Sequence, residues 1–196
     1  MEEQTSPWKT IGNREVYVNP WIRVREDQVI RPDEKPGIYG VIEYQNYAIG
    51  IVPVAENGDT WLVGQWRYPL DLYSWEIPEG GGPLGLPLID SAKRELQEEV
   101  GLTAGEWVDL GEHHLSNSVS NETGRVYLAL DLTEGHSEPE GDEVLQIRRL
   151  PIAEAYEMAM DGRITDALSI IGLTRAVHYL MVGAPVPPAP SLFPRR

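Results

Sequence analysis

Three glutamates, Glu95, Glu98 and Glu99, stand close behind Arg94 near the middle of this 196-residue sequence. At about 100° per residue, a helix would place these four side chains within roughly 140° of one face. The adjoining arc of the same helix is apolar and contains Ala92, Leu96 and Val100. Crowded carboxylates repel one another on a bare helix, whereas oxygen-rich sites suit Mg²⁺ or Mn²⁺. The spacing therefore predicts a helix that packs on one side and binds a divalent cation on the other.

The sequence also indicates where this helix begins and ends. Asp90 can accept hydrogen bonds from the first free backbone N–H groups as the N-cap, and Gly101 tolerates a left-handed C′ conformation. We therefore predict a start near Ser91 and an end near Val100. Upstream lies the Glu-Gly-Gly-Gly loop of residues 79–82, where a backbone without side chains can approach a ligand closely. A charged run alone is typical of a solvated helix face, but the glycine loop before it favours a functional site.

The segment from Gly80 to Leu102 resembles the Nudix box of the Nudix hydrolases, whose pattern is GX5EX7REUXEEXGU with U an aliphatic residue. Eight of the nine fixed positions match: Gly80, Arg94, Glu95, Leu96, Glu98, Glu99, Gly101 and Leu102. The one departure is Leu86, where the pattern has its first glutamate. In the family that glutamate supports the loop and the metal site, while the helix carboxylates hold the metals. The departure is therefore expected to affect efficiency more than chemistry.

The resemblance implies a reaction in which water attacks a phosphorus of a nucleoside diphosphate linked to another group, with Mg²⁺, or Mn²⁺ in its place, as the cofactor. It implies that Glu95 and Glu99 are metal ligands. Glu98 would be a further ligand or a catalytic partner, and the main-chain carbonyl of Glu79 would be a fourth metal contact. Arg94 would orient the carboxylates through charge-assisted pairs.

Two elements ahead of the box resemble those of one branch of the family. Residues 65–69, Gln-Trp-Arg-Tyr-Pro, and residues 75–78, Trp-Glu-Ile-Pro, are similar to the QxRxP and ELPAG elements of the ADP-ribose and GDP-mannose pyrophosphatases. In that branch the arginine corresponding to Arg67 grips the pyrophosphate, which suits a planar guanidinium. A surface arginine on a strand is the alternative interpretation. The aromatics of these elements are interpreted as packing residues of the core or of an interface: Trp66, Tyr68 and Trp75.

The rest of the chain supplies the elements that position these residues. The run from Val16 to Tyr44 predicts two long strands joined at residues 31–37, which form a β extension. Residues 47–54 and 60–66 predict a hairpin, because the Asn-Gly pair between them is a strong turn signal. Further strands are predicted at 107–111, 125–132 and 144–150, and helices at 152–160 and 165–182. The fold class expected is α/β, a Nudix α/β/α sandwich with a mixed β-sheet and an N-terminal antiparallel β extension.

Two polar loops are expected to complete the site. In the branch that the chain resembles, the loop equivalent to residues 116–122 reaches the substrate, so Glu122 is a candidate contact; a plain solvated loop is the alternative. Related enzymes place their general base in the region of residues 136–143, where four acids occur. We predict that Glu140 or Glu143 is this base, and the spacing does not separate them.

Composition limits the remaining possibilities. The chain has no cysteine, so neither disulfides nor a cysteine-containing zinc site is expected, and a net charge of −15 argues against nucleic-acid binding. Neither a signal peptide nor a long apolar run is recognised, so no membrane association is expected and the cytoplasm is the expected location. We predict three parts: an N-terminal β extension over residues 1–45, a Nudix hydrolase domain over residues 46–182, and a proline-rich disordered tail over residues 183–196.

These observations favour a Mg²⁺-dependent enzyme that cleaves a nucleoside diphosphate sugar of the ADP-ribose or GDP-mannose type into a nucleoside monophosphate and a sugar phosphate. One alternative is a catalytically weak Nudix-fold ligand-binding or regulatory module, motivated by Leu86, and another is a nucleoside triphosphate-cleaving Nudix enzyme. In the branch it resembles, N-terminal strands exchange between subunits, so a homodimer is expected through these strands. Tyr17 and Trp21 are candidates for stacking on a base, or for packing at the dimer interface. The sequence does not decide the base or the sugar.

Overall fold

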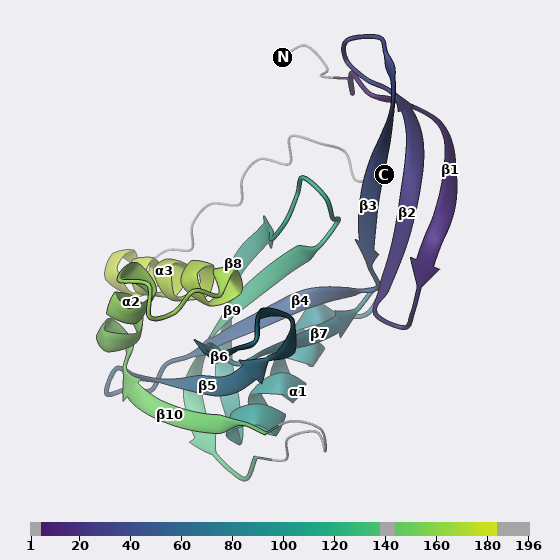
Figure 1. The fold of residues 1–196 in the computed structure, drawn as a ribbon. Helices are drawn as coiled ribbons and strands as arrows, with labels where there is room; N and C mark the ends of the chain where they lie inside the picture. The colour runs from purple at the N-terminus through teal and green to yellow at the C-terminus, as the bar shows by residue number, and fades with distance from the viewer. Residues whose placement is uncertain (1–4, 138–143, 184–196) are drawn as a thin grey trace. The chain divides into compact units, whose positions relative to one another are not determined.

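Ten strands and three α-helices are formed by residues 5–137 and 144–183, which the computed structural model describes, and Figure 1 shows their order along the chain. Contacts between Cα atoms divide the chain into two units. The first unit contains residues 5–46 and the loop 116–122, and the second contains residues 47–115, 123–137 and 144–183. Apart from Gly183, the predicted tail lies outside the described residues.

Three antiparallel strands in the order β1-β2-β3 form the first unit (Figure 1). Their bounds are Lys9–Val18 for β1, Ile22–Ile30 for β2 and Pro36–Tyr44 for β3. The loop 116–122 adds to β3, because the Ile42 N–H donates to the Val119 carbonyl (2.9 Å) and the Asn121 N–H donates to the Ile42 carbonyl (3.2 Å). The sequence predicted only two strands, from Val16 onward, and the third strand is a correction. Almost all of β1 is exposed, so it lacks the alternation that marks a half-buried strand.

The second unit contains two sheets. The first is mixed and has the order β7-β4-β9-β8, in which β4 runs parallel to β9 and β9 runs antiparallel to β8. The second has the order β10-β5-β6 and is antiparallel. The bounds are Asn46–Pro53 for β4, Asp59–Arg67 for β5, Leu72–Glu76 for β6, Glu79–Pro83 for β7, Leu102–His114 for β8, Thr123–Glu134 for β9 and Gln146–Pro151 for β10. A short 3-10 helix, η1, covers Tyr68–Leu70.

The predicted hairpin of residues 47–54 and 60–66 is wrong in its pairing. The turn itself exists: Gly58 has a φ of 83°, and the Ala55 N–H donates to the Asp59 carbonyl at 2.9 Å. Beyond a single bridge between Val54 and Thr60, however, β4 and β5 belong to different sheets. Both strands are buried over most of their length, so each takes neighbours within its own sheet. An Asn-Gly signal fixes a chain reversal, but it does not fix the partners of the strands that follow.

Helices cover both faces of the mixed sheet in the second unit (Figure 1). Their bounds are Leu88–Val100 for α1, Ile152–Met160 for α2 and Ala167–Val182 for α3. Successive side chains of β4 point to opposite faces, so Ile51 packs in the core cluster of α1, whereas Val52 packs in the cluster of α2 and α3. This arrangement confirms the expected α/β/α sandwich. Within the described residues, none of the helices is long and apolar enough to cross a membrane.

Candidate active site

Helix α1 carries the carboxylates that the sequence singled out. It begins at Leu88, with Pro87 at the N-cap position and no capping side chain, so the prediction of Asp90 as N-cap was wrong. The fixed φ of Pro87 is already suited to a helix start, and Asp90 lies in the first turn, where its charge favours the helix dipole. The predicted end is confirmed, because Gly101 has a φ of 69° and its N–H donates to the Gln97 carbonyl at 2.9 Å.

Two of these carboxylates are buried against the start of β7, because the segment 79–82, predicted as a loop, forms the first part of this strand. Glu95 is 9% exposed and Glu99 is 2% exposed. The backbone N–H of Glu79 donates to Oε2 of Glu99 at 2.9 Å. A Cβ atom on Gly80 would lie 2.1 Å from Cδ of Glu95, so only glycine leaves room for that carboxylate. The glycine of the motif is therefore required for the present position of the Glu95 carboxylate.

Arg94 contacts both of its predicted acidic partners. Its Nη2 lies 2.5 Å from Oε1 of Glu95, and its Nη1 lies 2.7 Å from Oε2 of Glu98. Nη2 also donates to the carbonyl of Gly81 at 3.2 Å. Arg94 thus ties two carboxylates of α1 to the glycine loop, which is the arrangement that an orienting residue needs.

Arg67 lies at the end of β5 and is held by two carboxylates. Its Nε donates to Oε1 of Glu76 at 2.9 Å, and its Nη2 lies 2.5 Å from Oε2 of the same residue. The same Nη2 also donates to Oε1 of Glu79. Burial alone would lower the pKa of Arg67, but Glu76 and Glu79 outweigh it and raise that pKa above its ordinary value. Arg67 is therefore charged and fixed in direction, not a free surface arginine.

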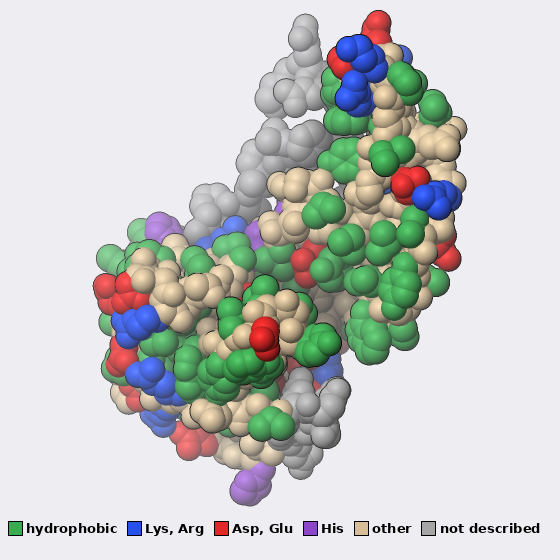
Figure 2. All heavy atoms as spheres, in the orientation of Figure 1, with side chains coloured by type: hydrophobic (Ala, Val, Ile, Leu, Met, Phe, Trp, Pro, Cys, Tyr) green, Lys and Arg blue, Asp and Glu red, His purple; other side chains and the backbone are tan. Residues whose placement is uncertain are grey.

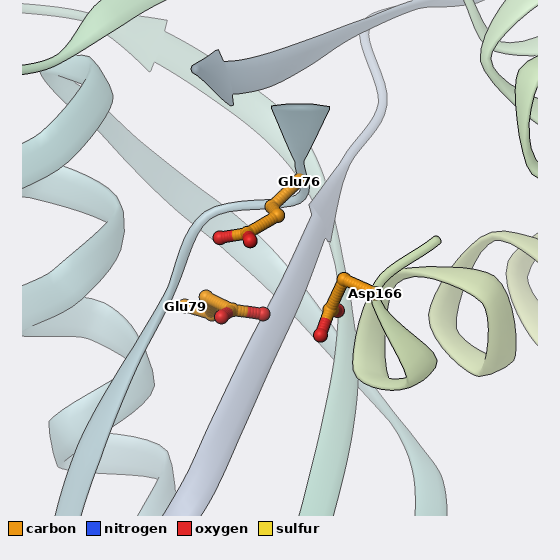
Figure 3. A group of neighbouring side chains, drawn as sticks. All are labelled: Glu76, Glu79 and Asp166. Carbon is orange, nitrogen blue, oxygen red and sulfur yellow. The ribbon is translucent and has the colours of Figure 1, made fainter. Parts of the chain in front are cut away.

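A second group of carboxylates surrounds this arginine. Oxygens of Glu76, Glu79 and Asp166 all lie within 4.8 Å of one another, and Figure 3 shows them converging from β6, from the start of β7 and from the start of α3. Asp166 is the N-cap of α3 and accepts the Ser169 N–H at 2.6 Å. Burial, followed by the charges of Asp166 and Glu76, raises the pKa of Glu79 well above its usual range, against the opposing effect of Arg67.

Sequence reasoning had assigned no role to Glu76 or Asp166. Glu76 is part of the Trp-Glu-Ile-Pro element, which the sequence did single out. Glu76 is only 2% exposed, and a glutamate buried to this extent needs a partner for its charge. Asp166 carried the signal of an N-cap, an aspartate directly before a helical pattern. Nothing local to either residue indicates that the fold brings them together.

The donor set of this region fits a divalent cation. All of the side-chain donors are carboxylate oxygens, the ligands that Mg²⁺ prefers. Oε2 of Glu79 is buried and, within the described residues, has no hydrogen-bond partner. A buried carboxylate oxygen without a donor is the arrangement that a cation stabilises.

The remaining predicted site residues belong to the first unit or lie outside the described residues. Tyr17 and Trp21, which are 55% and 67% exposed, and the half-buried Glu122 belong to the first unit. Glu140 and Glu143 lie outside the described residues, together with Glu138 and Asp142. The substrate and base roles given to these residues stay predictions.

Two of the aromatics interpreted as packing residues are exposed. Trp66 is 58% exposed and Tyr68 is 90% exposed, so core packing is wrong for both and packing at an interface stays a prediction, whereas Trp75 is half-buried and packs against the core. Figure 2 shows hydrophobic side chains gathered on the surface over β5 and β6. Leu86 is also exposed, at 60%, in the turn between β7 and α1.

Comparisons with known proteins bear on the family of this chain. A family model described as the nucleoside diphosphate sugar hydrolase N-terminal domain matches residues 8–42. A protein of Mycobacterium tuberculosis (strain ATCC 25618 / H37Rv) named ADP-ribose pyrophosphatase is 34% identical over 179 residues, which cover 90% of this chain and 86% of that protein. A Bacillus subtilis (strain 168) protein of the same name is 26% identical over 176 residues, which cover 89% of this chain and 92% of that protein.

A solved structure shares the fold, and a second family model covers the site. The crystal structure of ADP compounds hydrolase matches with a TM-score of 0.82 and 19% identity, covering 94% of this chain and 100% of that chain. The NUDIX domain model matches residues 45–168, which include α1, Arg67 and the three-carboxylate group. Because that model alone spans more than half of the sequence, the chain belongs to the Nudix hydrolase family.

Proposed function

We propose that this Nudix hydrolase cleaves the pyrophosphate bond of a nucleoside diphosphate sugar, of the ADP-ribose or GDP-mannose type, to give a nucleoside monophosphate and a sugar phosphate. The observation that carries the proposal is the position of Glu79, whose N–H binds Glu99 of the metal-binding helix and whose side chain binds Arg67. Glu79 thus contacts both a carboxylate proposed to bind Mg²⁺ and the arginine proposed to bind the pyrophosphate. The names of the two relatives, ADP-ribose pyrophosphatase, support this substrate class.

Each residue of the site has a distinct role in this proposal. Glu95 and Glu99 would hold Mg²⁺ together with Glu98 and the main-chain carbonyl of Glu79. The chemistry that a bound Mg²⁺ supplies is neutralisation of the pyrophosphate and activation of the attacking water. Arg94 holds the carboxylates in place.

The remaining roles concern the substrate and the proton. Arg67 grips the pyrophosphate, since a guanidinium can bind phosphate oxygens in pairs. Glu122 is proposed as a substrate contact. The general base that takes a proton from water is proposed to be Glu140 or Glu143.

The N-terminal strands are proposed to form a homodimer. Several apolar side chains of the first unit are exposed within the described residues: Ile11, Val16, Tyr17, Val18, Trp21 and Ile38. An exposed apolar patch of this kind supports an interface. Tyr17 and Trp21 would then stack on the nucleoside base or pack against the partner, and residues 1–45 and 46–182 would be the extension and the catalytic domain.

A substrate panel tests the proposal. Purified protein is incubated with ADP-ribose, GDP-mannose, UDP-glucose, dinucleoside polyphosphates and nucleoside triphosphates, with Mg²⁺ and with EDTA, and phosphate is measured after coupling to a phosphatase. We expect Mg²⁺-dependent cleavage of the sugar nucleotides alone. Tight binding without turnover would instead support a regulatory module, and cleavage confined to the triphosphates would contradict the substrate class.

A further inference from the structure

Arg67 has two edges on which it can hold an anion through a pair of hydrogen bonds. The side edge consists of Nε and Nη2, and the end edge consists of Nη1 and Nη2. Glu76 takes the side edge completely, because its two oxygens lie 2.9 Å from Nε and 2.5 Å from Nη2. A phosphate that is to be gripped by two hydrogen bonds is therefore confined to the end edge.

Glu79 already takes part of this end edge. Its Oε1 accepts a hydrogen bond from Nη2, whereas Nη1 has no acceptor among the residues that the structure describes. An incoming phosphate oxygen and the Glu79 carboxylate thus compete for the same nitrogen. Because the guanidinium is fixed by Glu76, it cannot turn to offer another pair of donors.

The surroundings of the Glu79 carboxylate make it unfavourable for this group to leave Arg67, because they offer it no other positive charge within the described residues. Its second oxygen, Oε2, is buried, and carboxylate oxygens of Glu76 and Asp166 lie within 4.8 Å. Since like charges at this separation repel one another, Arg67 is the group that holds the Glu79 carboxylate in place. Moving it off the arginine costs free energy, and that cost is subtracted from the affinity for the substrate.

We propose that the Glu79 side chain is an internal competitor that sets the affinity of Arg67 for the substrate pyrophosphate. The pyrophosphate binds the end edge of Arg67 only when the Glu79 carboxylate leaves it, so Glu79 raises KM. This inference rests on the proposed function, because it takes Arg67 to be the pyrophosphate contact. It concerns the side chain alone and is separate from the metal contact expected of the main-chain carbonyl.

The test replaces the side chain while keeping the backbone. Glu79→Ala removes the competing acceptor, so at saturating Mg²⁺ we expect KM for the sugar nucleotide to fall about tenfold, the effect of one charge-assisted contact, with kcat changed by less than about threefold. Glu79→Gln keeps an uncharged acceptor and should give an intermediate KM.

Further variants make the result decisive. Glu154→Gln changes a surface glutamate that pairs with Arg148 and serves as the unaffected control, and thermal unfolding verifies that every variant folds. In an Arg67→Lys background, Glu79→Ala should no longer lower KM, because the end edge is absent. An unchanged KM in Glu79→Ala, or an equal fall in the control Glu154→Gln, would overturn the inference while leaving the enzyme assignment intact. A wild-type protein without pyrophosphatase activity would overturn the proposed function itself.

Discussion

The backbone N–H of Glu79 donates to Oε2 of Glu99 at 2.9 Å, and this bond joins the start of β7 to the last turn of α1. Glu99 is 2% exposed, so its carboxylate is fixed in direction and cannot exchange this donor freely for water. A metal ligand needs a fixed orientation, which hydrogen bonds from its surroundings provide. The geometry therefore favours Glu99 as a metal ligand whose position is set by the first residue of β7.

We predict that Glu99→Gln lowers kcat by about 100-fold or more, beyond the roughly 10- to 100-fold effect of residues that only support a ligand. The amide keeps the hydrogen bond to Glu79 but loses the charge that binds a cation. Initial rates over a Mg²⁺ titration measure the effect, and Asp90→Asn, on the exposed first turn of the same helix, is the control. Full activity of Glu99→Gln would show that the metal role given to α1 is wrong.

Gly80→Ala is expected to change metal use more than stability. The new Cβ would lie 2.1 Å from Cδ of Glu95, and the flexible end of that side chain can move away at little cost. The displaced carboxylate would then bind Mg²⁺ poorly, so kcat should fall about tenfold and half-saturation should need more Mg²⁺. Gly40→Ala is the matched control, since nothing lies within 4 Å of its Cβ. An unchanged Mg²⁺ dependence would contradict this prediction.

The helix site could be predicted from the sequence because its signal is local. Glu95, Glu98 and Glu99 follow from spacing within one helix, and Gly101 follows from the special conformation that its position requires. The start of the helix was misplaced, because both Pro87 and Asp90 are residues that favour helix starts. In the structure Pro87 is the N-cap, and Asp90 lies within the first turn.

The second carboxylate group could not be predicted, because it is a product of tertiary structure. Asp166 is far from Glu76 and Glu79 in the sequence and meets them only because α3 packs against the segment between β6 and β7, where the Ile77 N–H donates to Oγ of Ser169 at 2.9 Å. β1 was missed for a different reason: almost all of its side chains are exposed, so its sequence shows no alternation of apolar and polar residues. A buried strand or helix face shows a periodic apolar pattern in the sequence, whereas polar residues that become neighbours only in the folded chain show no such pattern.

Leu86→Glu restores the glutamate of the motif and is expected to raise kcat by up to about tenfold, the range of residues that support a metal site. Leu86 is 60% exposed, so the substitution should leave the unfolding temperature unchanged. Leu84→Glu is the matched control, because Leu84 is 56% exposed in the same turn and lies outside the motif positions. An equal rate in Leu86→Glu and the wild type would show that another group already supplies the missing function.

His113 is a half-buried residue outside the proposed chemistry, and both of its ring nitrogens are buried. It lies on β8 opposite Gly124 of β9, and neither ring nitrogen makes a hydrogen bond of normal geometry within the described residues. Burial, aided by the charges of Arg175 and His114 and opposed by the Gly111 backbone and then by Asp166, lowers the pKa of His113 from 6.5 to about 4. The folded protein thus holds the imidazole neutral at pH values where the unfolded chain protonates it.

This difference predicts a loss of stability in acid. Above pH 6.5 both states keep His113 neutral, but between pH 6.5 and 4 only the unfolded state gains the proton, so the free energy of unfolding falls over that range. Allowing for partial exposure of the ring, the loss at pH 5 is on the order of 1 kcal/mol. The free energy of unfolding is measured by urea titration at pH 7 and at pH 5, and His113→Asn should reduce the difference between the two values by this amount. His136 is exposed, so His136→Asn should leave that difference unchanged. Equal pH dependence in the wild type and His113→Asn would refute the assignment, because a histidine buried as the neutral form cannot be replaced without changing the number of protons taken up on unfolding.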